Sequence, residues 1–207
     1  MLDRPRAILA LSRACFDDTS RPTRELFTAL AKEREVIFVE EPAAAEPGVP
    51  DSWEIQFPAP HLLVSRPVLR TPSRGFEKAP LGRVTAMLRQ LLRWQDIEDF
   101  VAWVDTPHAL PIAERLEAPF LVYECPDALW SPRSEEDPRL VRLEAELVRA
   151  ADLVLVADPG DAALSPSRTA LRMLADLAEA ERAPRALRRR RSLRGAPARR
   201  PRRGAAH

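Results

Sequence analysis

The sequence is poor in the residues on which several familiar kinds of site depend. Its 207 residues include six glycines, three histidines and two cysteines. The glycines fit neither the G-x-G-x-x-G dinucleotide fingerprint nor a phosphate-binding P-loop, and the histidines lack the spacing of metal ligands. We therefore expect neither a nicotinamide enzyme nor a nucleoside triphosphatase, and we expect no bound metal or cofactor.

Long apolar runs are missing as well. None approaches the roughly 20 residues that cross a bilayer, and the N-terminal run is too short for a secretory signal. Cys15 and Cys125 are too few for a disulfide framework, so a reducing compartment is the simpler assumption. These absences predict a cytoplasmic protein that touches the inner face of the membrane peripherally at most.

The C-terminal part of the sequence contains no aromatic residues and no acids. All twelve aromatic residues lie at or before Trp130, and the stretch from residue 185 onward has ten arginines and no acid. The preceding residues carry 22 basic against 31 acidic side chains, a formal charge of −9. Because the Arg/Ala/Pro-rich stretch has nothing to bury, residues 183–207 are predicted to be a disordered tail, and residues 1–182 to form one domain.

Two hypotheses account for this tail. Arginines bind nucleic-acid phosphates by releasing counterions, but without interleaved aromatic residues or a reader fold the tail supports at most sequence-blind binding. Alternatively, a shifted reading frame in a GC-rich gene produces sequence of this composition. The second hypothesis places the change of frame shortly after Asp158.

The hydrophobic pattern predicts an α/β fold with a parallel, Rossmann-like sheet and flanking helices. Strands buried on both faces are apolar at successive residues, and five such runs occur. Helices show apolar residues at a 3.6-residue period, as in residues 81–94 and in a segment that follows a Ser20 cap, with Pro22 in its first turn. A later helix should turn Leu140, Leu143, Leu147 and Val148 inward. The five predicted strands are residues 7–12, 36–39, 100–104, 120–123 and 152–157.

Between residues 43 and 75 the pattern is punctuated by prolines. Two short runs, residues 52–58 and 61–67, are each long enough for one strand and are separated by a Pro-Ala-Pro-His turn. We expect them to form an antiparallel or edge addition to the sheet.

Candidate site residues follow the two central strands. Residues 100–104 give way to Thr106, Pro107 and His108, and residues 120–123 give way to Glu124 and Asp127. Ligands of open α/β sheets bind beyond the carboxyl ends of neighbouring strands, where a carboxylate or imidazole can accept a proton from a substrate hydroxyl. The competing interpretation makes the two acids helix caps or solvated side chains, and the histidine a surface residue of a first helical turn.

Arg21 is a further candidate. It stands at the start of the first predicted helix, directly after the loop that leaves the first strand. Its guanidinium is placed to hold an anionic or sugar group in the same crevice. An ordinary surface ion pair would account for it equally well.

Four short motifs occur in an order that resembles the N-terminal half of bacterial GT-B class glycosyltransferases, of the family 1/4-like kind. They are SRPTREL at residues 20–26, EEP at 40–42, TPHALP at 106–111 and YECPDAL at 123–129, and LEAELVRAADLVLV at 143–156 resembles the helix and strand that follow. The match covers residues 7–158. It departs from the family at Ser20, where glutamine is usual, and at Glu124, where aspartate is usual.

The resemblance implies a Rossmann-like acceptor-binding domain that serves sugar transfer from a nucleotide-sugar donor to a growing cell-surface glycan or glycolipid. It places Arg21 near the domain cleft, Thr106 and Pro107 beside it, and Glu124 and Asp127 at the acceptor site. The family's second Rossmann-like domain, which binds most of the donor, has no counterpart here, so we expect no transfer by this chain alone. The alternatives are a glycan-binding or partner subunit without catalysis, and a nucleic-acid-associated protein with a basic tail.

Overall fold

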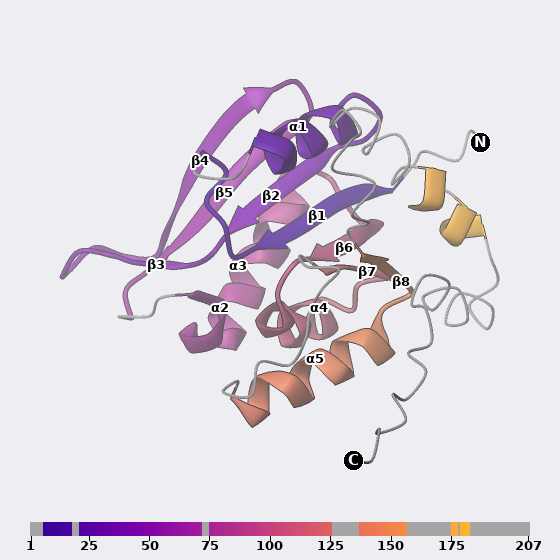
Figure 1. The fold of residues 1–207 in the computed structure, drawn as a ribbon. Helices are drawn as coiled ribbons and strands as arrows, with labels where there is room; N and C mark the ends of the chain where they lie inside the picture. The colour runs from indigo at the N-terminus through magenta and orange to yellow at the C-terminus, as the bar shows by residue number, and fades with distance from the viewer. Residues whose placement is uncertain are drawn as a thin grey trace, which may run out of the picture.

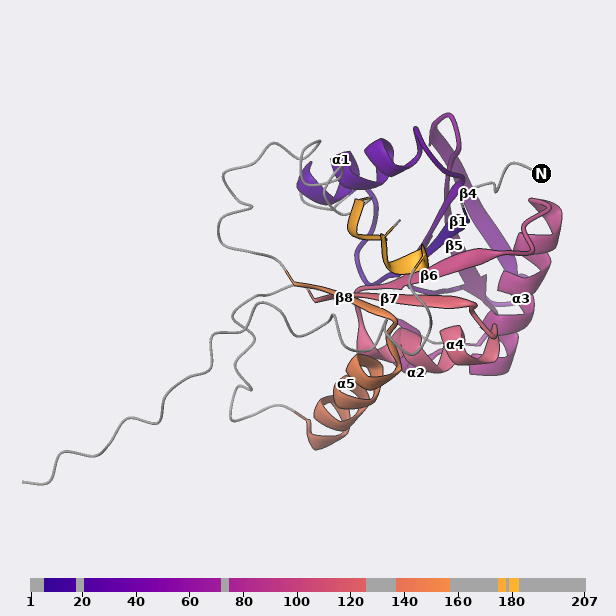
Figure 2. The ribbon, with the colours of Figure 1, turned by 90° about the vertical axis from the view of Figure 1, so that its right-hand side faces the viewer.

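The computed structural model describes residues 6–17, 21–71, 75–125, 137–156, 175–177 and 179–182. These residues form one eight-stranded sheet with helices on both of its faces (Figures 1 and 2). In chain order the elements are β1 (Ala7–Ser12), α1 (Arg21–Leu30), β2 (Val36–Glu40), β3 (Ala43–Ala44), β4 (Ser52–Ala59), β5 (Leu62–Leu69), α2 (Gly75–Lys78), α3 (Leu81–Trp94), β6 (Phe100–Val104), the 3₁₀ turn η1 (Pro107–Ala109), α4 (Leu110–Arg115), β7 (Phe120–Cys125), α5 (Pro138–Ala150) and β8 (Leu153–Val156).

The strand order is β3-β5-β2-β1-β6-β7-β8, with β4 paired to β5. Every pairing in the sheet is parallel except the one between β4 and β5. The chain thus runs from β1 outward to β2 and β5, and then returns to the other side of β1 with β6. The predicted α/β, Rossmann-like class is confirmed, and the point where the winding reverses lies between β1 and β6.

The sheet separates two hydrophobic cores. Successive residues of a strand point to opposite faces, so Ile8 and Ala10 of β1 join one core while Leu9 and Leu11 join the other. The first core lies under α1, and the second lies under α2, α3, α4 and α5 (Figure 2). Because both faces are covered, β1, β2 and β6 are buried along their whole length.

The strongly periodic helices begin and end close to where the sequence predicts. α3 spans Leu81–Trp94 as expected, and its Val84, Leu88 and Leu91 are buried against the sheet. The apolar residues at helical spacing in α1, Leu26, Phe27 and Leu30, are buried as predicted, and so is Ala31 directly after the helix. Ser20, the predicted cap of this helix, lies outside the described residues.

The proline-punctuated region departs from the prediction in one respect. β4 is an antiparallel edge strand, as expected, but β5 is an internal strand that pairs in parallel with β2. Leu62, Leu63 and Val64 are accordingly buried. The prolines within residues 58–67 misled the prediction because Pro67 sits beyond the part of β5 that pairs with β2.

A helical segment at residues 175–177 and 179–182 packs on the α1 face of the sheet (Figure 2). Leu177 and Ala180 are buried there, and Glu181 accepts two hydrogen bonds from the Arg34 guanidinium, at 3.2 and 2.9 Å. Both charged side chains are largely buried, and this ion pair joins the segment to the turn before β2.

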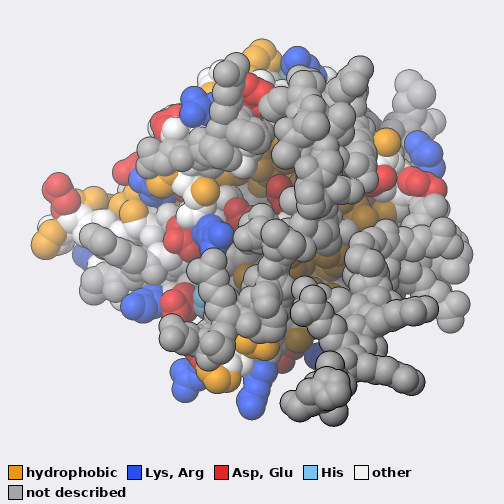
Figure 3. Space-filling model, in the orientation of Figure 1, with side chains coloured by type: hydrophobic (Ala, Val, Ile, Leu, Met, Phe, Trp, Pro, Cys, Tyr) orange, Lys and Arg blue, Asp and Glu red, His pale blue; other side chains and the backbone are white. Residues whose placement is uncertain are grey.

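On the described part of the face shown in Figure 3, acidic and basic side chains are interspersed. Among the described helices, none is long and apolar enough to cross a bilayer.

Candidate functional site

A row of polar side chains crosses the sheet where the parallel strands end. β1 and β6 pair so that Leu11 lies opposite Val104, which sets the next residues, Ser12 and Asp105, side by side. β6 and β7 continue this register, so Glu124 lies opposite Asp105. Asp105 and Glu124, which follow Ser12 by 93 and 112 positions in the sequence, therefore lie close to it at one edge of the sheet. The row extends to β2, where Glu40 pairs with Ser12.

All of these side chains lie on the α1 face. Ser12 follows Ala10 by two residues, and Asp105 follows Trp103 in the same way, so each points to the face where its predecessor is buried. Phe27 of α1 packs against the Trp103 ring on this face, in an edge-on contact with centroids 5.9 Å apart. Helix α1 therefore covers the row of polar side chains.

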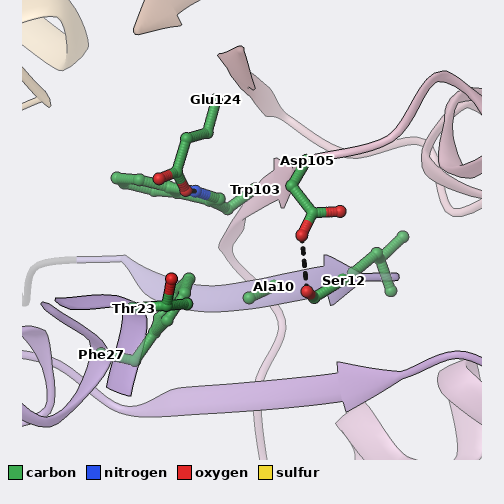
Figure 4. A pocket seen from close by; sticks show the side chains of 8 residues that line it. Ala10, Ser12, Thr23, Phe27, Trp103, Asp105 and Glu124 are labelled. Carbon is green, nitrogen blue, oxygen red and sulfur yellow. Dashed lines mark hydrogen bonds between the residues drawn. The ribbon is translucent and has the colours of Figure 1, made fainter. Parts of the chain in front are cut away.

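Between α1 and the sheet lies a pocket of about 230 Å³ (Figure 4). It occupies the topological switch point between β1 and β6, which is where ligands bind in open α/β sheets. Its walls come from β1, α1, β6 and β7, and its lining residues are Ala10, Leu11, Ser12, Thr23, Phe27, Trp103, Asp105 and Glu124.

Asp105 is held by hydrogen bonds on both of its oxygens. The Ser12 hydroxyl donates to Oδ2 at 2.5 Å, and the Arg13 backbone N–H donates to Oδ1 at 3.1 Å (Figure 4). Burial raises the pKa of this carboxyl, while the two hydrogen bonds act in the opposite direction by stabilising the ionised form. The side chain is thus fixed in one orientation against the end of β1.

Glu124 is held on one oxygen. The Trp103 indole N–H donates to Oε2 at 2.6 Å, and Figure 4 shows the carboxyl lying beside the indole ring. Burial raises the pKa of Glu124 to about 7, the indole hydrogen bond lowers it, and the nearby Asp105 raises it further. A carboxyl with this pKa exists in both protonation states near neutral pH, which suits a group that exchanges a proton with a ligand hydroxyl.

A second hollow, of about 290 Å³, lies farther along the row, over β2 and β5. Arg66 forms an ion pair with Glu40 there at 2.5 Å and donates a hydrogen bond to Cys15 Sγ at 2.6 Å. Glu40 also accepts the backbone N–H of Phe16 at 2.6 Å. These contacts fix the loop that leaves β1, and so they support the position of Ser12 in the first pocket.

The structure brings one of the predicted residues into the pocket. Glu124 lines it, although as a member of β7 rather than of the loop after it, because β7 runs on to Cys125 by pairing with β8. Thr106, Pro107 and His108 follow β6 in η1 and are not among the lining residues.

The other predicted residues have the following places. Thr106 is buried, and the His108 side chain lies near Glu41, whose pKa is raised by burial and is lowered in part by this histidine. Arg21 is the first residue of α1, and nothing is described of its side chain. Asp127 lies outside the described residues, so its proposed role stays a prediction.

The sequence reasoning missed Ser12 and Asp105 as site residues. Each is the first polar residue at the end of a buried strand, which was a usable signal. Among the described residues no group of three or more His, Cys, Asp or Glu side chains is placed to hold a metal ion.

No family model matches this chain, and no curated protein matches its sequence. Among solved structures, one described as trehalose-6-phosphate from E. coli bound with UDP-2-fluoro glucose matches with 14% sequence identity and a TM-score of 0.47. The match covers 83% of this chain and 43% of the other, so this chain spans less than half of that protein's length.

Proposed function

We propose that this domain is the acceptor-binding half of a GT-B class glycosyltransferase, and that its pocket binds a hydroxyl group of a sugar acceptor. The observation that carries the proposal is that Glu124 lines the pocket at the switch point of the sheet, and this pocket also offers the hydroxyl of Ser12 and the carboxylate of Asp105. The order of the four motifs that resemble this class of enzyme supports the proposal.

In the proposed reaction, Glu124 acts as the base. An acceptor hydroxyl attacks the anomeric carbon of a nucleotide sugar, a new carbon–oxygen bond forms, and the bond from that carbon to the phosphate oxygen breaks. The nucleoside diphosphate leaves, and the hydroxyl proton passes to Glu124. Asp105 is held by Ser12 and Arg13, so its role is to accept a hydrogen bond from a neighbouring acceptor hydroxyl.

The resemblance supplies further roles that belong to the proposal. Asp127 would stand beside Glu124 at the acceptor, and Arg21, Thr106, Pro107 and His108 would border the cleft to the donor. Transfer requires donor and acceptor to be held together. We therefore propose that the donor binds across a cleft to a second Rossmann-like domain or to a partner chain, and that the acceptor is part of a cell-surface glycan or glycolipid.

Calorimetric titration of the protein with glucose, galactose and mannose tests this proposal. We expect at least one of the three to bind, and Glu124→Gln to weaken that binding about tenfold, since the variant can no longer accept a proton or a strong hydrogen bond from the hydroxyl. Glu33→Gln removes an equal charge from an exposed position in the turn that follows α1 and should leave binding unchanged.

The proposal fails if none of the three sugars binds, or if the Glu124 and Glu33 variants bind equally well. Mixing the protein with candidate partner chains and a nucleotide sugar then separates two functions. Transfer in such a mixture supports a glycosyltransferase half, whereas binding without transfer in every mixture supports a glycan-binding subunit.

A further inference from the structure

The pocket has an unusual balance of charge. Among the eight residues that line it, Asp105 and Glu124 are ionisable acids and none is basic. They come from adjacent strands and lie opposite one another, so their side chains start about 5 Å apart. A ligand group in this pocket meets both carboxyls at close range.

Among the described residues, Arg13 is a basic side chain that acts on these charges. The side chain of Arg13 lowers the pKa of Asp105, but it is exposed, and solvent therefore screens its charge. In a pocket of about 230 Å³, few water molecules fit between a bound sugar and the two carboxyls. The repulsion felt by a second anion is then weakly screened.

One feature of the fold acts in the opposite direction. Thr23 in the first turn of α1 lines the pocket, and the N-terminus of a helix favours anions. This turn contains no acidic residue that would offset the helix dipole. The dipole is equivalent to about half of one positive charge, however, which is less than the charge of the two carboxylates together.

We infer that the pocket accepts unphosphorylated sugars, neutral or bearing a protonated amine, and excludes the phosphorylated forms of the same sugars. This inference rests on the proposed function, whose acceptor site it describes in more detail. The resulting order of affinity is amino sugar, then neutral sugar, then sugar phosphate. The acceptor must accordingly present a sugar from which any phosphate has been removed, or to which none was added, at the end that enters the pocket.

The test uses matched ligands that differ in charge. The full-length protein is titrated at about pH 7.5 by calorimetry with each of glucose, galactose and mannose, with the 6-phosphate of each, and with the 2-amino derivative of each. For the sugar that binds, we expect the 6-phosphate to bind at least about tenfold more weakly, and the amine to bind at least as tightly as the neutral form.

Two charge variants assign the discrimination to the pocket. In Asp105→Asn the ratio of neutral to phosphorylated affinity should fall by several-fold, since one of the two repelling charges is gone, while Glu33→Gln should keep the wild-type ratio. Circular dichroism confirms that the Asp105 variant is folded before it is titrated.

The possible outcomes distinguish the proposed sugar-binding function from the proposed exclusion of sugar phosphates. If no sugar binds in any form, the proposed function is wrong. If the neutral sugar binds and its phosphate binds equally or better, the acceptor site stands and the exclusion of phosphate is wrong. A ratio that is the same in the Asp105 variant and the wild type would also overturn the exclusion mechanism.

Discussion

Two neighbouring residues of β7 carry similar chemistry onto opposite faces of the sheet. Tyr123 points toward α5, where its hydroxyl donates a hydrogen bond to Glu144 at 2.7 Å. Glu124 points toward α1, where it accepts a hydrogen bond from the Trp103 indole at 2.6 Å. Each face thus contains a carboxyl bonded to one aromatic donor.

The two faces differ in what surrounds the pair. On the α5 side both partners are buried, with 2% of Tyr123 and 8% of Glu144 exposed, and the contact ties the helix to the sheet. On the α1 side the carboxyl borders a pocket. An aromatic donor on a buried carboxyl therefore does not identify a functional site. The empty space beside Glu124 makes it the candidate of the two, because a ligand in the pocket would meet Glu124 and not the buried Glu144.

The largest effect on stability is expected on the α5 face of the sheet, where Tyr123 and Glu144 are buried. Glu144→Ala leaves the Tyr123 hydroxyl buried without its acceptor and also leaves a cavity, so it should lower the free energy of unfolding by about 2–4 kcal/mol. Urea denaturation at pH 7 measures this. Glu146→Ala, on the exposed side of the same helix, is the matched control and should change stability by about 0.5 kcal/mol or less. Equal losses in the two variants would show that the Tyr123 contact does not anchor α5.

On the α1 face, where Glu124 borders the pocket, the effect of a substitution on stability should depend on pH. The pKa of Glu124 is about 7 in the folded protein and has an ordinary value of 4.5, so between these values the folded chain holds a proton that the unfolded chain has released. The contribution of Glu124 to wild-type stability therefore falls as the pH rises through this window. Glu124→Gln carries no such charge, and it should exceed the wild type by about 1–3 kcal/mol at pH 8.5 and match it near pH 4.5.

Urea denaturation of both proteins across this pH range measures the difference. Asp105 and Glu41, whose pKa values are also raised by burial, contribute to both proteins and largely cancel. A difference in stability that is constant between pH 4.5 and 8.5 would contradict the account of Glu124.

A smaller effect is expected where the pocket meets β1. Ser12→Ala removes the hydroxyl that donates to Asp105 and accepts the Ala14 N–H at 3.1 Å, and should cost about 1 kcal/mol, since pocket water can replace part of the contact. The control is Ser65→Ala. The Ser65 hydroxyl is buried without a partner among the described residues, so its removal should be neutral or slightly stabilising. If both serine variants lose the same stability, the bond to Asp105 contributes nothing.

The smallest effect is expected for a carboxylate that is mostly exposed to solvent. Glu54 lies 3.6 Å from Arg66, and 62% of its side chain is exposed. Glu54→Gln should change the free energy of unfolding by about 0.5 kcal/mol or less, and the change should shrink further in 0.5 M salt. A larger loss in urea denaturation would mean that this exposed pair acts together with Glu40.

The strands and helices with a strong hydrophobic period were predictable from the sequence. β1, β6 and α3 have the predicted bounds because their apolar residues recur at the period of one type of element. The end of β7 was not predictable in this way, since Glu124 and Cys125 are polar or ambiguous residues that join the strand by pairing with β8.

Helix α5 shows a second limit. Its amphipathic pattern predicted Val148 to face inward, but 40% of this residue is exposed, while Glu144 is buried. The reason is the Tyr123 hydroxyl, which lies 21 residues earlier in the chain and provides a partner for a buried acid. Likewise, Ser12 and Asp105 are joined only by the pairing of β1 with β6. Neither contact can be predicted from the spacing of residues along the chain.

The central claim is that Glu124 is a proton-exchanging group open to a sugar hydroxyl. NMR titration of the carboxyl carbon in protein labelled with ¹³C at the glutamate side chains measures this directly, with Glu124→Gln assigning the signal. We predict a midpoint near pH 7 for Glu124. We also predict that the midpoint shifts when the sugar that binds in calorimetry is added. A midpoint near 4.5 that does not respond to any of the three sugars would contradict the account.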